Sequence, residues 1–138
     1  MPIQRVSQRV AAWWRRRGSL GARGERAAAR HLRKLGYRIL ARNLRTKLGE
    51  IDILAQDPRH GCLVVVEVKA ASGDAFAPEL HVNPHKRRKL SALASQLVRR
   101  YRLHDRLVRF DVVGLVWPAE SRKPTRLTHH IGAFESTL

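Results

Sequence analysis

Apolar residues recur at spacings of three and four along two stretches of the chain, 20–35 and 84–101. That spacing places them on one side of an α-helix. The first stretch is followed by Gly36, a residue that readily adopts the left-handed conformation found at helix ends. The second is preceded by Asn83, a residue type that caps helices, and opens with Pro84, which favours the first helical position. The pattern predicts two amphipathic helices.

Shorter apolar runs, bounded by turn-forming residues, lie between and after these helices and are typical of β-strands. The expected strands are 37–44, 49–56, 63–69 and 108–117, with a fifth over 126–131. A loop rich in Gly, Ser and Pro begins at Ala70, directly after the third strand. The order helix, three strands, helix, strand predicts an α/β fold with a central mixed sheet and helices packed against it.

The length and charge of the chain indicate how many domains it forms and what kind of partner it binds. At 138 residues it is the size of one domain, and 28 Lys+Arg against 11 Asp+Glu give a net charge of +17. We expect a loosely ordered basic arm over 1–19 and a single domain over 20–138. Because so large an excess of charge opposes compaction, we expect a polyanionic partner, nucleic acid and first of all DNA. A membrane surface or a merely solubilising charge is the alternative.

The cysteine count and the hydropathy of the chain indicate the cellular compartment in which the protein is expected. The single cysteine cannot form an internal disulfide, which suits a reducing environment. No run approaches the roughly 18 apolar residues of a membrane helix, and the N-terminus lacks the apolar stretch of a secretory signal. We therefore expect a cytoplasmic protein without a membrane partner. The segment 5–17 is rich in arginine and carries Trp13 and Trp14, so a transit peptide or a membrane-surface helix is a second interpretation of the arm.

The third expected strand ends in an acid and a base. Strand residues alternate between faces, so Glu67 and Lys69 project from one face, about 7 Å apart. The other face carries valines: Val64, Val66 and Val68. The apolar run before the acid places both charges at a desolvated edge of the core, where a cation bound by Glu67 would compensate them and Lys69 would orient or deprotonate a water. The alternative is a weak surface ion pair.

The second expected strand carries an acid in an apolar setting. Alternation puts Ile51 and Ile53 on one face and Asp52 on the other. Mg²⁺ usually needs one or two protein carboxylates besides waters and substrate phosphate, and Asp52 with Glu67 supplies two if the strands pair as a hairpin. The alternative for Asp52 is an acid near a turn. We interpret Glu50 as a solvated residue.

One acid of the first helix offers a further ligand. Glu25 lies in the apolar stripe that should face the sheet, and the positions three or four residues away hold no Lys or Arg. A surface ion pair therefore does not explain it. Two interpretations remain open, a third acidic group at the metal site and a favourable interaction with the helix N-terminal dipole.

The second helix begins with a run of cations, although the dipole of a helix N-terminus disfavours each by up to about 1 kcal/mol. A phosphate backbone would compensate both this mismatch and the repulsion within the run. The candidate nucleic-acid contacts are this run and two residues near the second strand: Lys86, Arg87, Arg88, Lys89, Arg45 and Lys47. An ordinary solvated basic face is the alternative.

Taken together, these residues resemble the PD-(D/E)xK nuclease superfamily, in which an Asp on one strand and an acid-x-Lys on the next form the active site. More closely, the chain is similar to the small bacterial YraN family, whose relation to archaeal-type Holliday-junction resolvases is inferred from fold and motif. The likeness rests on Gly24-Glu25, Asn43, Gly49-Glu50-Ile51-Asp52, Val66-Glu67-Val68-Lys69, Lys86 and Arg109-Phe110-Asp111.

The resemblance implies a restriction-endonuclease-like fold. It also implies Glu25, Asp52 and Glu67 as metal ligands, Lys69 as the catalytic lysine and Lys86 near the substrate phosphates. The chain departs from the family in one respect, because an Arg commonly stands two residues after the motif lysine, where this sequence has alanine.

The combined interpretation is a Mg²⁺-dependent endonuclease, with Mn²⁺ as the alternative ion, that hydrolyses phosphodiester bonds in linear or branched DNA. Its main rival is a nucleic-acid-binding module that keeps the fold and does not cleave. A structural partner of an acidic protein is a third interpretation. A two-fold symmetric junction as substrate would favour a homodimer.

Overall fold

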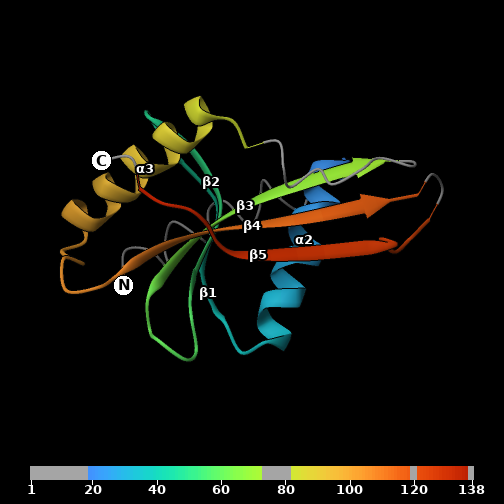
Figure 1. Ribbon diagram of the computed structural model, residues 1–138, viewed down its shortest axis with the longest axis horizontal. Coiled ribbons are helices and arrows are strands. Elements are labelled where there is room, and N and C mark those ends of the chain that lie inside the picture. Colours follow the sequence, from blue (N-terminus) through green and yellow to red (C-terminus); the bar gives the residue numbers. More distant parts are fainter. Residues whose placement is uncertain (1–18, 73–81, 119–120, 137–138) are drawn as a thin grey trace.

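The computed structural model describes residues 19–72, 82–118 and 121–136. The arm expected over 1–19 lies outside the described residues apart from Ser19. The described chain forms a five-stranded sheet with one helix packed on each face (Figure 1). Its elements are α2 (Leu20–Lys34), β1 (Arg38–Thr46), β2 (Gly49–Gln56), β3 (Leu63–Ser72), α3 (Pro84–Arg100), β4 (Val108–Trp117) and β5 (Arg126–Phe134).

The sheet has the strand order β1-β2-β3-β4-β5. β3 and β4 are parallel and joined through α3, whereas the other neighbouring strands are antiparallel. The mixed sheet and the α/β class expected from the sequence are thus confirmed, and the arrangement is consistent with a restriction-endonuclease-like core. The prediction that a loop begins at Ala70 was wrong. β3 continues to Ser72 because its last residues pair with β4, a contact that no local pattern reveals.

The core consists of two apolar layers, one on each face of the sheet. The layer under α3 includes Leu90, Leu93, Leu97, Ile51, Leu54, Val65 and Phe110. The layer under α2 includes Ala28, Ala29, Leu32, Ile53, Val64, Val66, Val113 and Leu115. Asn83 caps α3 as expected, since its Oδ1 accepts from Lys86 N, and the structure adds a cap for α2, where Ser19 Oγ accepts from Ala22 N. Neither helix is both long and apolar enough to span a membrane, among the residues that the structure describes.

The first half of α2 lies close against β3. A Cβ atom built on Gly24 would stand 2.8 Å from the Cβ of Ala70, which is closer than real Cβ contacts allow. The absence of a side chain at this position therefore lets the helix backbone approach the strand. This approach directs the next residue, Glu25, toward the sheet, where its side chain is buried.

β2 separates from β3 halfway along its length. β1 and β2 pair over their full extent, but β2 pairs with β3 only from Ile53, opposite Val66, onward. The interpretation that Ile51 and Ile53 share a face was wrong. Ile51 packs in the layer under α3 and Ile53 in the layer under α2, so the strand turns over at Asp52 between them.

The partner strand explains this change of face. Asn43 on β1 lies opposite Asp52, between the registered pairs Arg42–Ile53 and Leu44–Ile51. Its φ of 53° falls in the left-handed region, which asparagine tolerates better than most residues. The β1–β2 hairpin therefore bends away from β3 at Asn43 and Asp52, and the bend opens a gap between β2 and β3.

Candidate active site at the divergence of β2 and β3

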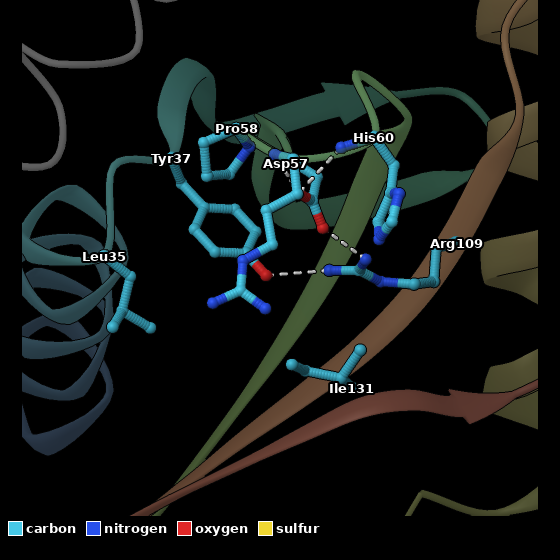
Figure 2. A pocket seen from close by; sticks show the side chains of 8 residues that line it. Leu35, Tyr37, Asp57, Pro58, His60, Arg109 and Ile131 are labelled. Carbon is cyan, nitrogen blue, oxygen red and sulfur yellow. Dashed lines mark hydrogen bonds and ion pairs between the residues drawn. The ribbon is translucent and has the colours of Figure 1, made fainter.

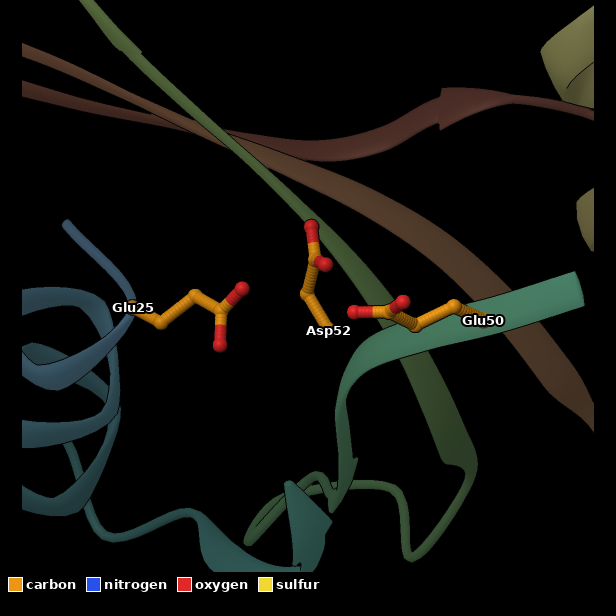
Figure 3. A group of neighbouring side chains, drawn as sticks. All are labelled: Glu25, Glu50 and Asp52. Carbon is orange, nitrogen blue, oxygen red and sulfur yellow. The ribbon is translucent and has the colours of Figure 1, made fainter. Parts of the chain in front are cut away.

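Three carboxylates converge at this gap. Glu25 projects from α2, and Glu50 and Asp52 project from β2, with one oxygen of each within 4.8 Å of the others. Figure 3 shows the three side chains pointing toward one another, Asp52 in the middle. Glu25 is only 8% exposed and the other two are half-buried. The sequence interpretation of Glu25 as an inward-facing acid agrees with this placement.

Glu50 was missed by sequence reasoning. Its side chain is 35% exposed, which agrees with the interpretation of a solvated residue, but its carboxylate also joins Glu25 and Asp52 and lies 3.5 Å from Arg45 Nε. Its spacing of two from Asp52 was a usable signal, since residues two apart on a strand share a side. When the strand turns over at Asp52, Glu50 stays beside it.

Asp52 bridges the two diverging strands. Its Oδ2 accepts a hydrogen bond of 2.8 Å from the backbone N–H of Val68 on β3. This bond replaces the strand partner that β3 loses beyond Val66. Burial raises the pKa of Asp52, against the opposing effects of the Val68 bond and the Lys86 ammonium. Asp52 is thereby placed next to Glu67, the residue that precedes Val68.

Glu67 stands between two lysines. Its carboxylate is 4% exposed, with Oε1 3.6 Å from Lys69 Nζ and Oε2 3.7 Å from Lys86 Nζ. Within the described residues Oε2 has no hydrogen-bond partner. Burial and the nearby Asp52 raise the pKa of Glu67 to about 7, against the two ammonium groups, which lower it. The ionised form of Glu67 therefore depends on nearby positive charge, and the two lysines supply part of it.

The donor set suits a hard divalent cation. Four of the chain's 11 acidic residues gather here, although the chain as a whole carries +17. All four offer oxygen, the ligand type that Mg²⁺ and Mn²⁺ prefer, whereas zinc and copper sites favour nitrogen and sulfur. Mg²⁺–oxygen distances near 2.1 Å place opposite ligands about 4 Å apart, so the 4.8 Å group would need only a small contraction. The buried, unbonded Oε2 of Glu67 also fits such a role.

The six candidate nucleic-acid contacts are placed in different surroundings. Lys86 and Arg45 reach the carboxylates, as described above. Arg87 instead supports the fold, because its Nε donates to Val82 O at 3.0 Å and its guanidinium lies 5.5 Å from the centre of the Phe134 ring. Three remain on the exposed surface: Lys47, Arg88 and Lys89.

A second polar network lies at the other end of β2, where the chain passes into β3 (Figure 2). Arg109 on β4 donates to Asp57, to Tyr37 Oη at 2.8 Å and, through two nitrogens, to both oxygens of Asp111. His129 Nε2 lies 2.8 Å from Asp111 Oδ2. A pocket of about 310 Å³ opens beside this network and is lined by Leu35, Tyr37, Asp57, Pro58, Arg59, His60, Arg109 and Ile131.

The network holds two carboxylates ionised. Burial raises the pKa of Asp57, but the hydrogen bond from Arg109 and the N–H groups of Arg59 and His60 outweigh it and lower that pKa to about 2. Asp111 is fully buried, and hydrogen bonds from His129 and Arg109 lower its pKa despite that burial. Sequence reasoning noticed this network only as a motif of the resemblance. Its members come from four separate segments of the chain, which no local signal connects.

The chain is similar to many proteins of one family. Residues 24–115 match the family described as "Uncharacterised protein family UPF0102". The UPF0102 protein of Pelobacter propionicus is 41% identical over 116 residues, covering 83% of this chain and 81% of the relative. The UPF0102 protein of Desulforamulus reducens is 44% identical over 106 residues, covering 75% of this chain and 86% of the relative. That of Mycolicibacterium smegmatis is 43% identical over 109 residues, covering 78% and 87%.

Proposed function

This chain belongs to the uncharacterised protein family UPF0102, the YraN family, and from that premise we propose that it is a divalent-metal-dependent endonuclease that hydrolyses phosphodiester bonds in DNA. One observation carries the proposal. Four carboxylates and two lysines converge at the gap between β2 and β3 in a chain that is otherwise strongly cationic. The positive charge of the chain would attract the polyanion, and the cluster of carboxylates at the gap would form the reactive centre.

Each group at the gap has a role in this proposal. Asp52 and Glu67, with Glu25 and Glu50 beside them, would hold Mg²⁺ or Mn²⁺. When bound, the cation would neutralise charge that develops on the scissile phosphate. Lys69, whose Nζ lies 3.6 Å from Glu67, would orient the attacking water and stabilise the hydroxide left when the water gives its proton to solvent. The new P–O bond would form as the bond to the leaving oxygen breaks, and that oxygen would take up a proton from a solvent water.

Lys86 links the centre to the substrate. It stands at the N-terminus of α3, where local electrostatics disfavour a cation, and its Nζ reaches the second oxygen of Glu67. A phosphate beside the cation would be a better partner for Lys86 than a carboxylate that is also needed as a ligand. The exposed Arg88 and Lys89, further along the same helix, would extend this contact to neighbouring phosphates.

One observation favours a second candidate, a nucleic-acid-binding module that does not cleave. Lys69 and Lys86 already place two ammonium groups beside Glu67, so the carboxylate is partly compensated by the protein itself. A binding module would have the same basic surface and need no cation.

Cleavage assays separate the two candidates. End-labelled linear duplex, single-stranded and branched DNA, with RNA of the same sequences, would be incubated with the protein in Mg²⁺, in Mn²⁺ and in EDTA. We expect products from at least one DNA substrate with either ion and none in EDTA. Binding of all substrates without products under any condition would reject the nuclease and favour the module.

Metal binding should also be visible in stability. Because the pKa of Glu67 rises from 4.5 to about 7 on folding, metal-free protein should lose stability as pH increases through this interval, when the unfolded chain ionises first. Between pH 5 and pH 8 we expect the wild type to lose roughly 2–3 kcal/mol relative to Glu67→Gln. Comparing the two proteins cancels the contributions of other titrating groups.

Magnesium should reverse this loss in the wild type only. At pH 8 the carboxylate is ionised and ready to bind, so Mg²⁺ should raise the melting temperature of the wild type and leave Glu67→Gln nearly unchanged. Urea unfolding at several pH values, with and without Mg²⁺, gives both results. If the free energy of unfolding changed with pH in the same way in the wild type and in Glu67→Gln, the raised pKa of Glu67 would be contradicted. An equal effect of Mg²⁺ on both would contradict the ligand role of Glu67.

A further inference from the structure

Four arginines line a pocket that the proposed function does not use. Arg23, Arg26 and Arg30 come from α2 and Arg122 from the connection between β4 and β5, with Trp117 as part of the wall. The pocket has a volume of about 160 Å³ and contains no acidic side chain among the described residues that line it. We call it the arginine pocket. Its wall therefore brings four arginine side chains around one small space.

This arrangement opposes the local stability of α2. Spacings of three and four residues make Arg23, Arg26 and Arg30 neighbours on one side of the helix, where like charges repel. The first turn of α2 contains no acid, so its dipole also disfavours the cation at Arg23. An anionic ligand with several oxygens would relieve both effects.

Arg23 is positioned before any ligand arrives. Its guanidinium carbon lies 5.2 Å from the centre of the Trp117 ring, and Trp117 Nε1 donates to Ser121 O at 2.8 Å, which fixes the ring. The Nε of Arg23 is buried and has no hydrogen-bond partner in the part of the chain that the structure describes. A donor that is fixed in place and unsatisfied is what a phosphate oxygen would bind.

The arginine pocket lies beyond the carboxylates and on the other side of the sheet from α3. Trp117 pairs with Ser72, five positions along β3 from Glu67, which corresponds to about 16 Å at 3.3 Å per residue. α2 and α3 cover opposite faces. The carboxylates therefore stand between the arginine pocket and the basic start of α3.

We propose that the arginine pocket is a second phosphate-binding site for the nucleic acid, holding its backbone several nucleotides away from the bond to be cleaved. This inference rests on the proposed function for the identity of the polyanion. It assigns α2 a binding role besides its contribution of Glu25. Substrate would then be anchored on both faces of the sheet with the reactive centre between the two anchors.

The test compares two double variants of equal charge. Arg26→Ala/Arg30→Ala removes two exposed arginines from the pocket, and Arg38→Ala/Arg99→Ala removes two exposed arginines far from it. Binding of a labelled 30-base-pair DNA duplex would be measured in EDTA over a range of salt concentrations. We expect the pocket variant to bind roughly tenfold more weakly, with the slope of log K against log salt reduced by about 2, and the control to change by less than about twofold.

Several outcomes would overturn the inference. Equal weakening in both variants would show a general charge effect, and unchanged binding in the pocket variant would show that the pocket plays no part. Loss of binding to anionic lipid vesicles, with DNA binding unchanged, would assign the pocket to a membrane surface. Melting curves of both variants check that the fold is intact.

The same measurements separate this inference from the proposed function. A wild type that binds DNA but never cleaves it, with weaker binding in the pocket variant, would reject the nuclease and support the arginine pocket. If the wild type cleaves DNA and the pocket variant has unchanged affinity and salt slope, the nuclease is supported and the arginine pocket is rejected. A wild type that binds no DNA would reject both. If both are right, the pocket variant should show a raised KM with little change in kcat.

Discussion

Replacing Lys69 with alanine is expected to lower the cleavage rate by roughly 10²- to 10⁴-fold, the range for loss of a group that assists proton transfer. Lys69 is half-buried on β3, and its ammonium is fixed beside Glu67 at the gap. The apolar stem of the lysine contributes little to the core, so the fold should survive the change. Single-turnover cleavage of the substrate that the wild type cuts best, with saturating Mg²⁺, gives the rate directly.

DNA affinity decides how this result is interpreted. Lys69→Ala should bind the substrate within about twofold of the wild type in EDTA, since one phosphate contact among many contributes little. Lys34→Ala, a loss of the same charge from the exposed end of α2, serves as the control and should cleave normally. A Lys69→Ala protein that cleaves at the wild-type rate would remove this residue from the mechanism. If affinity and cleavage fell together, Lys69 would be a substrate contact instead.

Replacing Arg109 with alanine should destabilise the protein by about 3–5 kcal/mol, the cost of breaking a buried ion pair by removing one partner. Asp111 is 0% exposed and, among the residues that the structure describes, would keep His129 and the N–H of Gly132 as its hydrogen-bond partners. Asp57 would lose the donor that contributes most to lowering its pKa. Two carboxylates would then lose their shared cation, and one of them, Asp111, is fully buried.

Urea unfolding near pH 7 measures this loss. Arg99→Ala, an exposed arginine near the end of α3, should change stability by less than about 0.5 kcal/mol. Arg109→Lys should recover only part of the loss, because an ammonium lacks the planar fork that contacts Asp57, Tyr37 and Asp111 together. A loss below about 1 kcal/mol in Arg109→Ala would mean that water enters and replaces the network.

Much of the fold could be predicted because its signals are local. Asn83 and Pro84 mark the start of α3, and the apolar spacings mark both helices and the five strands. The end of β3 could not be predicted, since Ala70 to Ser72 are held in the strand by pairing with β4 rather than by their own pattern. Pairing between segments far apart in sequence overrides local preference.

The candidate site was partly predictable for the same reason. Glu67 and Lys69 stand out because they end an apolar strand, and Asp52 because it interrupts one. Glu50 does not stand out in the sequence. Its approach to the other carboxylates depends on the bend of the β1–β2 hairpin and hence on the left-handed backbone of Asn43. The sequence shows an asparagine at this position but not the conformation that its neighbours impose on it.

The connectivity of the sheet has a kinetic consequence. β1, β2 and β3 follow one another as antiparallel neighbours, so their pairing requires only short chain closures and can occur early in folding. β3 meets β4 only after the chain has passed through α3, which makes this parallel contact slower. The carboxylates on β2 and β3 can therefore approach one another in a nascent chain, whereas Lys86 joins them only when α3 docks.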